Sequence, residues 1–342
     1  MQHIQASPSC IAHVEERYLK QIIRLGQEAC RRPMPMICVP PLPQKPFAFG
    51  DLVPLGFLLR ALRSGSHDPE IARGLTAFIN AKKQGALWAF HSGHLITATD
   101  SALILLGLDD VEAVQTLQMF YDGHGGYYPQ LWSEEPRPDH MLLKNSYRHW
   151  CQSDYGTTCL IRGLRQQHHL ACTTSLSYLS EGFEQRSGLY FANPYLVDWA
   201  LALALKDDPQ AAELRMQLLL EVLTSQAPDG TFGCFDRACS IALAVLTLKT
   251  LGYGGQAVMH AQEWIANTSV TAEKARPFYS SEILDDQQFS LHELLLLKAL
   301  NEEQVARVGA HYHAISYYED HAQMINCALI FLALQESFQE HG

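Results

Sequence analysis

Charged residues are scarce in this sequence, and no segment concentrates positive charge. Asp, Glu, Lys and Arg make up only 18% of the 342 residues, and the formal net charge is -11. Because nucleic-acid binding depends on Lys and Arg that neutralise phosphates, this composition predicts no nucleic-acid partner. Uninterrupted apolar runs of about 18 residues are also missing, so we expect no membrane-spanning helix.

Cysteine pairs and a hydrophobic leader are missing as well. The nine Cys include no CxxC pair and form no regular framework, which is typical of reduced thiols inside a cell. The first nine residues are polar, and charged residues follow at Glu15, Glu16 and Arg17, so we expect no signal peptide. These features predict a cytoplasmic protein, with peripheral membrane contact as an option.

The sequence also lacks the common motifs of cofactor and metal chemistry. GxSxG, P-loop, GxGxxG and HExxH patterns do not occur, and the spacing of His311 and His313 would put them on different faces of a helix. The Asp pairs at 109–110, 207–208 and 285–286 lack the third acid of a DDxxD magnesium motif. We therefore expect neither a cofactor nor a metal site.

Helical periodicity is what the sequence has in abundance. Segments that are apolar nearly all round alternate with amphipathic segments. The former are 52–62, 102–108, 196–205, 241–251, 291–300 and 325–334, and the latter are 69–83, 111–121, 211–225, 256–267 and 302–310. A helix that is apolar on all sides is buried on all sides. The pattern predicts an all-α fold, a single α/α barrel of about six helical hairpins, with an inner ring inside an outer ring and essentially no sheet.

We expect one domain over residues 1–342, with an N-terminal part at 1–48 and barrel repeats at 49–342. A helix at 11–30 should belong to the outer ring. The proline-rich stretch 32–43 cannot be helical and predicts an extended strap across the barrel. The alternative is an apolar rim that contacts membrane or a lipid substrate. Residues 132–144 are predicted to form a long loop, of the kind that often builds a site.

A short pattern recurs between these helices, with a period of roughly 40–50 residues. A Gln or polar turn is followed by Gly, an aromatic residue and then an Asp near the start of an apolar helix. Gln226, Gly230 and Phe232 form the fullest copy, and Gln84 and Trp88 bound a shortened one. Such self-similarity indicates stacked helical hairpins, whose turns bring aromatic and acidic side chains to one end of the barrel.

These turns resemble the QW motifs of squalene-hopene and oxidosqualene cyclases, the class II terpene cyclases. Asp100, followed by Ser101 and Ala102, is similar to the catalytic Asp at the start of an inner helix in that family. The longer family motif has a second Asp where this chain has Ala98. The length fits one barrel, as in bacterial meroterpenoid cyclases and the β-subunits of protein prenyltransferases. The resemblance implies an enzyme that protonates an alkene or epoxide of a linear isoprenoid and cyclises it through carbocations.

That chemistry needs a neutral carboxylic acid in a dry cavity whose aromatic faces stabilise cations. Asp100 is the first candidate acid, with Asp154 second and Asp320 third, and each can equally be a helix cap. The candidate substrate-binding residues are Trp88, His94, Trp150, Tyr155, Tyr190, Trp199 and Phe235. Each aromatic residue can instead simply pack outer helices against inner ones. We expect the carboxyl of Asp100 to be hydrogen-bonded from another repeat.

Other functions remain open at the level of sequence. A protein- or isoprenoid-prenyltransferase-like barrel would use a metal, and a glycan-active (α/α)6 enzyme would use two carboxylates and aromatic platforms. A binding barrel without catalysis is the fourth possibility. The expected partner is a hydrophobic isoprenoid small molecule, with no obligate protein partner.

Overall fold

The computed structural model describes residues 8–40, 45–65, 67–131, 152–233, 236–268, 274–281 and 315–335. Six of its helices form a closed ring in which each packs on the next and the last packs on the first. In order they are α2 (Val53–Ser64), α4 (Ala98–Leu105), α6 (Tyr155–Gln167), α8 (Pro194–Leu205), α10 (Arg237–Thr250) and α14 (Met324–Leu334). Every residue of α4, α8 and α14 is buried. The predicted α/α-barrel fold is confirmed.

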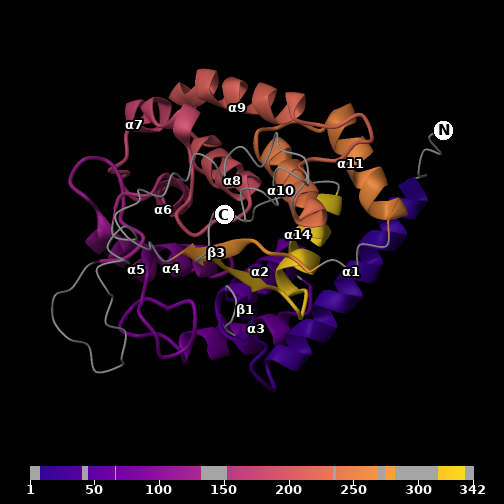
Figure 1. The fold of residues 1–342 in the computed structure, drawn as a ribbon, viewed down its shortest axis with the longest axis horizontal. Helices are drawn as coiled ribbons and strands as arrows, with labels where there is room; N and C mark the ends of the chain where they lie inside the picture. Colours follow the sequence, from indigo (N-terminus) through magenta and orange to yellow (C-terminus); the bar gives the residue numbers. More distant parts are fainter. Residues whose placement is uncertain are drawn as a thin grey trace.

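A second set of helices lies outside this ring, as Figure 1 shows. It consists of α1 (Pro8–Ala29), α3 (Pro69–Asn80), α5 (Val111–Thr116), α7 (Leu176–Glu181), α9 (Ala212–Thr224) and α11 (Gln256–Asn267). Short 3-10 helices η1 (Leu117–Phe120), η3 (Phe183–Gln185) and η4 (Pro209–Ala211) adjoin them. Outer helices bury one stripe only: α3 buries Ile71, Leu75 and Ile79, four residues apart. The N-terminal helix packs outside α2 and α14, as predicted.

The inner helices run parallel to one another. At one end, Thr99 of α4 bonds Thr157 of α6 through their hydroxyls at 2.6 Å, and Asn193, the N-cap of α8, bonds Ser240 of α10 at 2.9 Å. At the other end, Arg162 of α6 donates to the Ala204 carbonyl of α8 at 2.6 Å. Near the same end, Arg63 of α2 donates to the Gly107 carbonyl after α4, and Lys249 of α10 donates to the Ala333 carbonyl of α14. All six helix N-termini therefore lie at the first end of the barrel, together with Asp100, Asp154 and Asp320. None of the helices in the described ranges combines the length and hydrophobicity needed to span a bilayer.

The recurring turns precede these N-termini. In the fullest copy, Gln226 and Phe232 form a β-bridge, and the Gln226 amide donates to the carbonyls of Gly230 and Ala257. Gly230 has φ +86°, a left-handed conformation that favours glycine. Phe232 is fully buried against the ring of Tyr195. The aromatic residue of this turn therefore anchors the connection rather than facing open space.

The helix α6 was not among the predicted apolar segments, although residues 155 to 165 of it are all buried. Its Arg162 and Arg165 make the segment look polar, yet both guanidinium groups are buried and donate to backbone carbonyls. The predicted helices at 291–300 and 302–310, and the predicted loop at 132–144, lie outside the described residues.

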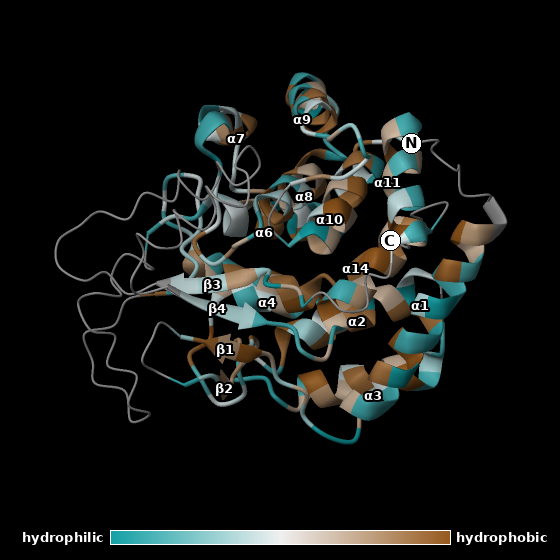
Figure 2. Ribbon diagram, turned by 45° about the vertical axis from the view of Figure 1, so that its right-hand side comes forward, coloured by the Kyte–Doolittle hydropathy of each residue, from teal (hydrophilic) through white to brown (hydrophobic). Residues whose placement is uncertain are grey.

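The expectation of essentially no sheet is wrong. Four short strands form an antiparallel sheet in the order β2 (Phe47–Ala48), β1 (Ile37–Val39), β4 (Ile315–Glu319) and β3 (Phe278–Ser281). Cys38 pairs with Tyr318, which pairs in turn with Phe278. Part of the proline-rich stretch is thus an extended strand, held by residues far away in the sequence. Figure 2 shows β3 and β4 lying beside α4, where the sheet adjoins the inner ring.

Candidate active site

A cavity of about 140 Å³ lies where the sheet meets the N-terminus of α4. Its walls come from the segment after β2, the connection that leads into α4, the start of α4 itself, the turns before α6 and α8, and strands β3 and β4. The lining residues are Phe49, Phe90, His94, Leu95, Thr97, Thr99, Asp100, Leu103, Gln130, Tyr190, Phe278, Tyr279 and Tyr318. Aromatic rings dominate this set, and Asp100 is its one carboxyl group among the described residues.

Asp100 lies in the first turn of α4 and is 9% exposed. Thr97 is the N-cap of the helix, and its hydroxyl accepts the Asp100 backbone N–H at 3.0 Å. The same hydroxyl donates to Oδ2 of the Asp100 carboxyl at 2.5 Å. The side-chain partner of the carboxyl is therefore Thr97, at the start of the same helix, and the expected side-chain partner from another repeat is wrong.

The surroundings of Asp100 favour its neutral form. Burial raises the pKa of the Asp100 carboxyl to about 7, while hydrogen bonds from the Thr97 side chain and the Phe90 backbone act in the opposite direction. Near neutral pH a substantial fraction of Asp100 therefore carries a proton. A carboxylic acid that is protonated at the wall of an apolar cavity can transfer that proton to a bound molecule.

Asp154 and Asp320 are also buried, at 3% and 1% exposure, but their oxygens are used differently. Asp154 caps α6: one oxygen accepts the Thr157 N–H and the other the Leu189 N–H, both at 2.7 Å. Asp320 accepts three backbone N–H groups at the start of α14. Neither lines the cavity. Burial raises the pKa of both carboxyls, that of Asp320 to about 6.

The aromatic side chains around Asp100 form a connected set. The Phe90 ring lies 4.9 Å from that of Tyr318 and 5.9 Å from that of Phe278, both with edge-to-face geometry. The Phe49 ring lies 5.7 Å from Phe90, and His94 meets Phe49 edge-on at 4.9 Å. Ring faces attract cations, at roughly 0.5–2 kcal/mol each. The cavity thus combines one acid with walls suited to positive charge.

The predicted substrate-binding residues divide into three groups. His94 and Tyr190 line the cavity, and the Tyr190 hydroxyl donates to the Gln130 side chain at 2.8 Å. Trp88, Tyr155 and Trp199 are buried elsewhere. Trp150 and Phe235 lie outside the described residues.

The three residues buried elsewhere have structural contacts. The Trp88 indole donates to the Ile79 carbonyl of α3 at 2.8 Å, and the Trp88 backbone bonds the Ser101 hydroxyl of α4. The Tyr155 hydroxyl donates to the Leu179 carbonyl at 2.8 Å. Trp199 lies under the Arg60 guanidinium, 4.9 Å from its carbon to the ring centroid. Their packing is that of a barrel core.

Of the thirteen lining residues, only Asp100, His94 and Tyr190 were among the predicted site residues; Phe49, Thr97 and Gln130 are examples of those that were not. Thr97 could have been found, because a Thr three residues before an Asp is a common N-cap pattern. Phe49 and Gln130 offered no such signal, since their positions depend on the sheet and on the turn before α6.

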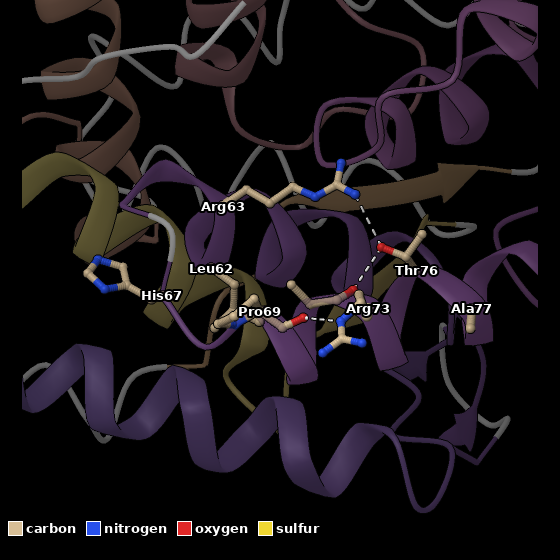
Figure 3. Close-up of a pocket in the computed structure, with 8 residues that line it drawn as sticks. Leu62, Arg63, His67, Pro69, Arg73, Thr76 and Ala77 are labelled. Carbon is tan, nitrogen blue, oxygen red and sulfur yellow. Dashed lines mark hydrogen bonds between the residues drawn. The ribbon is translucent and has the colours of Figure 1, made fainter.

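A larger pocket, of about 450 Å³, lies at the opposite end of α2 (Figure 3). Arg63 donates there to the Gly107 carbonyl at 2.8 Å and to the Thr76 hydroxyl at 3.3 Å, and Arg73 donates to the Pro69 carbonyl. Its described lining has basic and apolar side chains and no acid. This pocket therefore lacks the proton donor that distinguishes the cavity at Asp100. Within the described ranges, no group of three or more His, Cys, Asp or Glu is placed to hold a metal ion.

Comparison with known proteins gives structural relatives only. No family model matches the sequence, and no curated protein is similar to it in sequence. A variant of the type II terpene cyclase MstE from Scytonema, in complex with its substrate geranylgeranyl dihydroxybenzoate, superposes with a TM-score of 0.65 at 14% identity, covering 94% of this chain and 96% of that one. A second MstE variant holds its product, merosterolic acid A, with the same TM-score.

Two other solved structures are similar. The ent-copalyl diphosphate synthase from Streptomyces platensis has a TM-score of 0.54 at 14% identity, over 83% of this chain and 50% of that one. A protein from Actinoplanes has a TM-score of 0.63 at 12% identity, over 94% of this chain and 98% of that one. The chain therefore has the fold of type II terpene cyclases.

Proposed function

We propose that this protein is a class II terpene cyclase that uses Asp100 to protonate a linear isoprenoid. The observation that carries the proposal is a single buried carboxyl group at the wall of an aromatic cavity, with one side-chain hydrogen bond, on Oδ2. Such an acid suits a reaction that begins with proton transfer to an alkene or epoxide. The fold, shared with enzymes of that type, supports the same assignment.

The reaction would proceed without gain or loss of atoms. The Asp100 O–H bond breaks and its proton forms a C–H bond at one carbon of the terminal alkene, which leaves a cation on the neighbouring carbon. The π electrons of the next alkene then form a C–C bond and move the cation along the chain. Loss of a proton to a base ends the sequence with a new alkene, and a solvent proton restores Asp100. The net change is an isomerisation.

The cavity walls would serve two purposes in this sequence. The rings of Phe90, Phe278 and Tyr318 would stabilise the cation as it forms near Asp100. The apolar surface of these rings, of which Phe278 is buried and the other two are partly buried, would also keep water from capturing the cation early. Among substrate classes, a prenylated dihydroxybenzoate is favoured by the MstE complexes, and a polyprenyl chain without that head group is the second choice.

The test is incubation of the purified protein with geranyl, farnesyl and geranylgeranyl dihydroxybenzoates and with polyprenyl diphosphates, in the presence and absence of EDTA. Mass spectrometry should find products with the mass of the substrate but a different retention time. In heavy water each product should gain one deuterium at the carbon protonated first. Loss of turnover with EDTA, or release of diphosphate without deuterium uptake, would instead support the metal-dependent prenyltransferase-like alternative.

The pH dependence gives an independent check. If Asp100 must be protonated to act, kcat/KM should fall about tenfold per pH unit above its pKa of about 7. A profile that rises or stays level between pH 7 and pH 9 would contradict a role for Asp100 as the acid.

A further inference from the structure

The hydroxyl group of Thr97 takes part in two hydrogen bonds with Asp100. It lies 3.0 Å from the backbone nitrogen of Asp100 and 2.5 Å from Oδ2 of its carboxyl group. In the common capping box, an acidic residue at the position of Asp100 reaches back to the backbone N–H of the N-cap. Here the Thr97 N–H is already used, because it donates to the Trp88 carbonyl at 3.3 Å. The Asp100 carboxyl is therefore free of that capping role and lines the cavity instead.

Counting donors assigns the protons around this carboxyl. A hydroxyl group can donate one hydrogen bond through its hydrogen and can accept others through its lone pairs. The backbone N–H of Asp100 can only donate, so the Thr97 oxygen accepts from it and keeps its own hydrogen for Oδ2. When Asp100 is neutral, Oδ2 is then the carbonyl-like oxygen. Because Thr97 donates to Oδ2, the acidic proton is favoured on Oδ1, and the Phe90 backbone is the other hydrogen-bonding group at the carboxyl.

We propose that Thr97 is a positioning residue for the acid: its hydroxyl occupies Oδ2 of Asp100, so that the transferable proton is held on Oδ1. The same hydrogen bond stabilises the carboxylate that remains after proton transfer, which makes Asp100 a stronger acid than burial alone would allow. This inference rests on the proposed function for its effect on turnover, and on the hydrogen bonds alone for its effect on Asp100.

Among the described residues that line the cavity, four other side chains are titratable. They are His94 from the connection before α4, Tyr190 from the turn before α8, Tyr279 from β3 and Tyr318 from β4. Burial raises the pKa of the Tyr318 phenol, so it stays neutral at physiological pH. No Lys or Arg is among the described lining residues. Thr97 is therefore the side chain through which the acidity of Asp100 can be adjusted most directly.

The test measures the Asp100 carboxyl itself. Protein labelled with ¹³C at the Asp side-chain carbonyl is titrated by NMR, and the Asp100 signal is identified by its loss in Asp100→Asn. Thr97→Val removes the hydroxyl at nearly constant volume and should move the Asp100 titration to higher pH by about one unit, a tenfold change in proton affinity. Thr97→Ser keeps the hydroxyl and should titrate like the wild type. An unchanged titration in Thr97→Val would overturn the proposal.

Two further variants separate acidity from helix capping. Thr97→Gly also removes the hydroxyl, and Gly at an N-cap costs only a few tenths of a kcal/mol, so this variant serves if Thr97→Val does not fold. Ser175 caps α7 in the same way, accepting the Tyr178 N–H at 3.1 Å, and it is exposed and distant in sequence from the cavity. Ser175→Ala should lower stability slightly without moving the Asp100 titration. A similar shift of the Asp100 titration in Ser175→Ala would mean that the shift follows from a general loss of stability, and it would overturn the proposal.

Kinetics then distinguish this proposal from the proposed function. With a substrate that turns over, Thr97→Val should reduce kcat about tenfold or more with little change in KM, and Thr97→Ser should restore it. A shifted titration together with no turnover of any isoprenoid by the wild type supports the role of Thr97 and counts against the cyclase. Reduced turnover with an unshifted titration supports the cyclase and overturns the role of Thr97.

Discussion

Helices α4 and α14 each have a buried aspartate at or near their start, but the two carboxyl groups differ in their hydrogen bonds and in their surroundings. Asp320, before α14, accepts three backbone N–H groups and has no contact with the cavity. Asp100, in the first turn of α4, has one side-chain hydrogen bond and faces aromatic rings. Burial raises the pKa of both carboxyls, so a raised pKa alone does not identify a catalytic acid. What distinguishes them is that the Asp100 carboxyl lines the cavity, whereas the Asp320 carboxyl is used to cap a helix.

The largest effect expected from this difference is on turnover. Asp100→Asn keeps the size of the side chain and an oxygen for Thr97, but removes the transferable proton. We expect kcat to fall about a thousandfold, within the range lost when a general acid is removed. Asp154→Asn and Asp320→Asn should retain turnover in whatever fraction of the protein is folded. A fully active Asp100→Asn would refute its role and make Asp154 and then Asp320 the next candidates.

The next largest effect is on stability. Asp100→Asn should lower turnover but raise the stability of the folded protein. The folded pKa of Asp100 is about 7 against an ordinary value of 3.8, so the folded state binds its proton more tightly than the unfolded chain. The protonated carboxyl makes its full contribution to the free energy of unfolding below about pH 4, and this contribution is lost as the pH rises to about 7. Replacing the ionisable group should therefore stabilise the protein at pH 8 by about 2–4 kcal/mol.

This gain should disappear on acidification. Denaturant unfolding of wild type and Asp100→Asn at pH 8, pH 6 and pH 4 should show a difference that shrinks with each step. A variant that is less stable than the wild type at pH 8 would mean that the carboxylate of Asp100 supports the fold, as that of a structural cap does.

Most of the inner helices could be predicted from the sequence, because apolar residues cover all of their faces. The exception is α6, where Arg162 contacts the Thr174 and Ala204 carbonyls and Asp208. A buried guanidinium satisfied by the ends of neighbouring segments cannot be told from a surface one without the fold. The outer-ring prediction for 256–267 matches α11 in both bounds.

The cavity could be predicted only in part. Asp100, His94 and Tyr190 lie near predicted turns, so local pattern sufficed to propose them. Phe49, Phe278 and Tyr318 depend on a sheet that joins residues 37–48 to residues 278–319. Pairing across such a distance leaves no periodic signal in either segment. The difference between Asp100 and the two other acids was likewise invisible, since it depends on which backbone N–H groups reach each carboxyl.

Asp320→Ala should have a smaller effect on stability than Asp100→Asn, with the opposite sign. It leaves three backbone N–H groups at the start of α14 without their acceptor, and a buried donor without a partner costs about 1–3 kcal/mol. Removal of a buried charge, whose pKa is raised to about 6, offsets part of that loss. We expect a net destabilisation of about 1–3 kcal/mol at pH 7 in thermal or denaturant unfolding. A variant that is more stable than the wild type would mean that the buried charge outweighs the three hydrogen bonds.

The smallest expected effect concerns the aromatic wall and needs a matched pair of substitutions. Phe278 lines the cavity and is 3% exposed, while Phe232 is equally buried in a repeat turn that does not reach the cavity. Replacing either with Leu should cost similar packing, so both variants should lose comparable stability. Only Phe278→Leu removes a ring face near Asp100, and the cation–π energy of about 0.5–2 kcal/mol predicts a decrease in kcat of roughly 2- to 30-fold. Equal kcat in the two variants would show that the ring of Phe278 fills space without stabilising charge, and the difference between Asp100 and the capping aspartates would then rest on the acid alone.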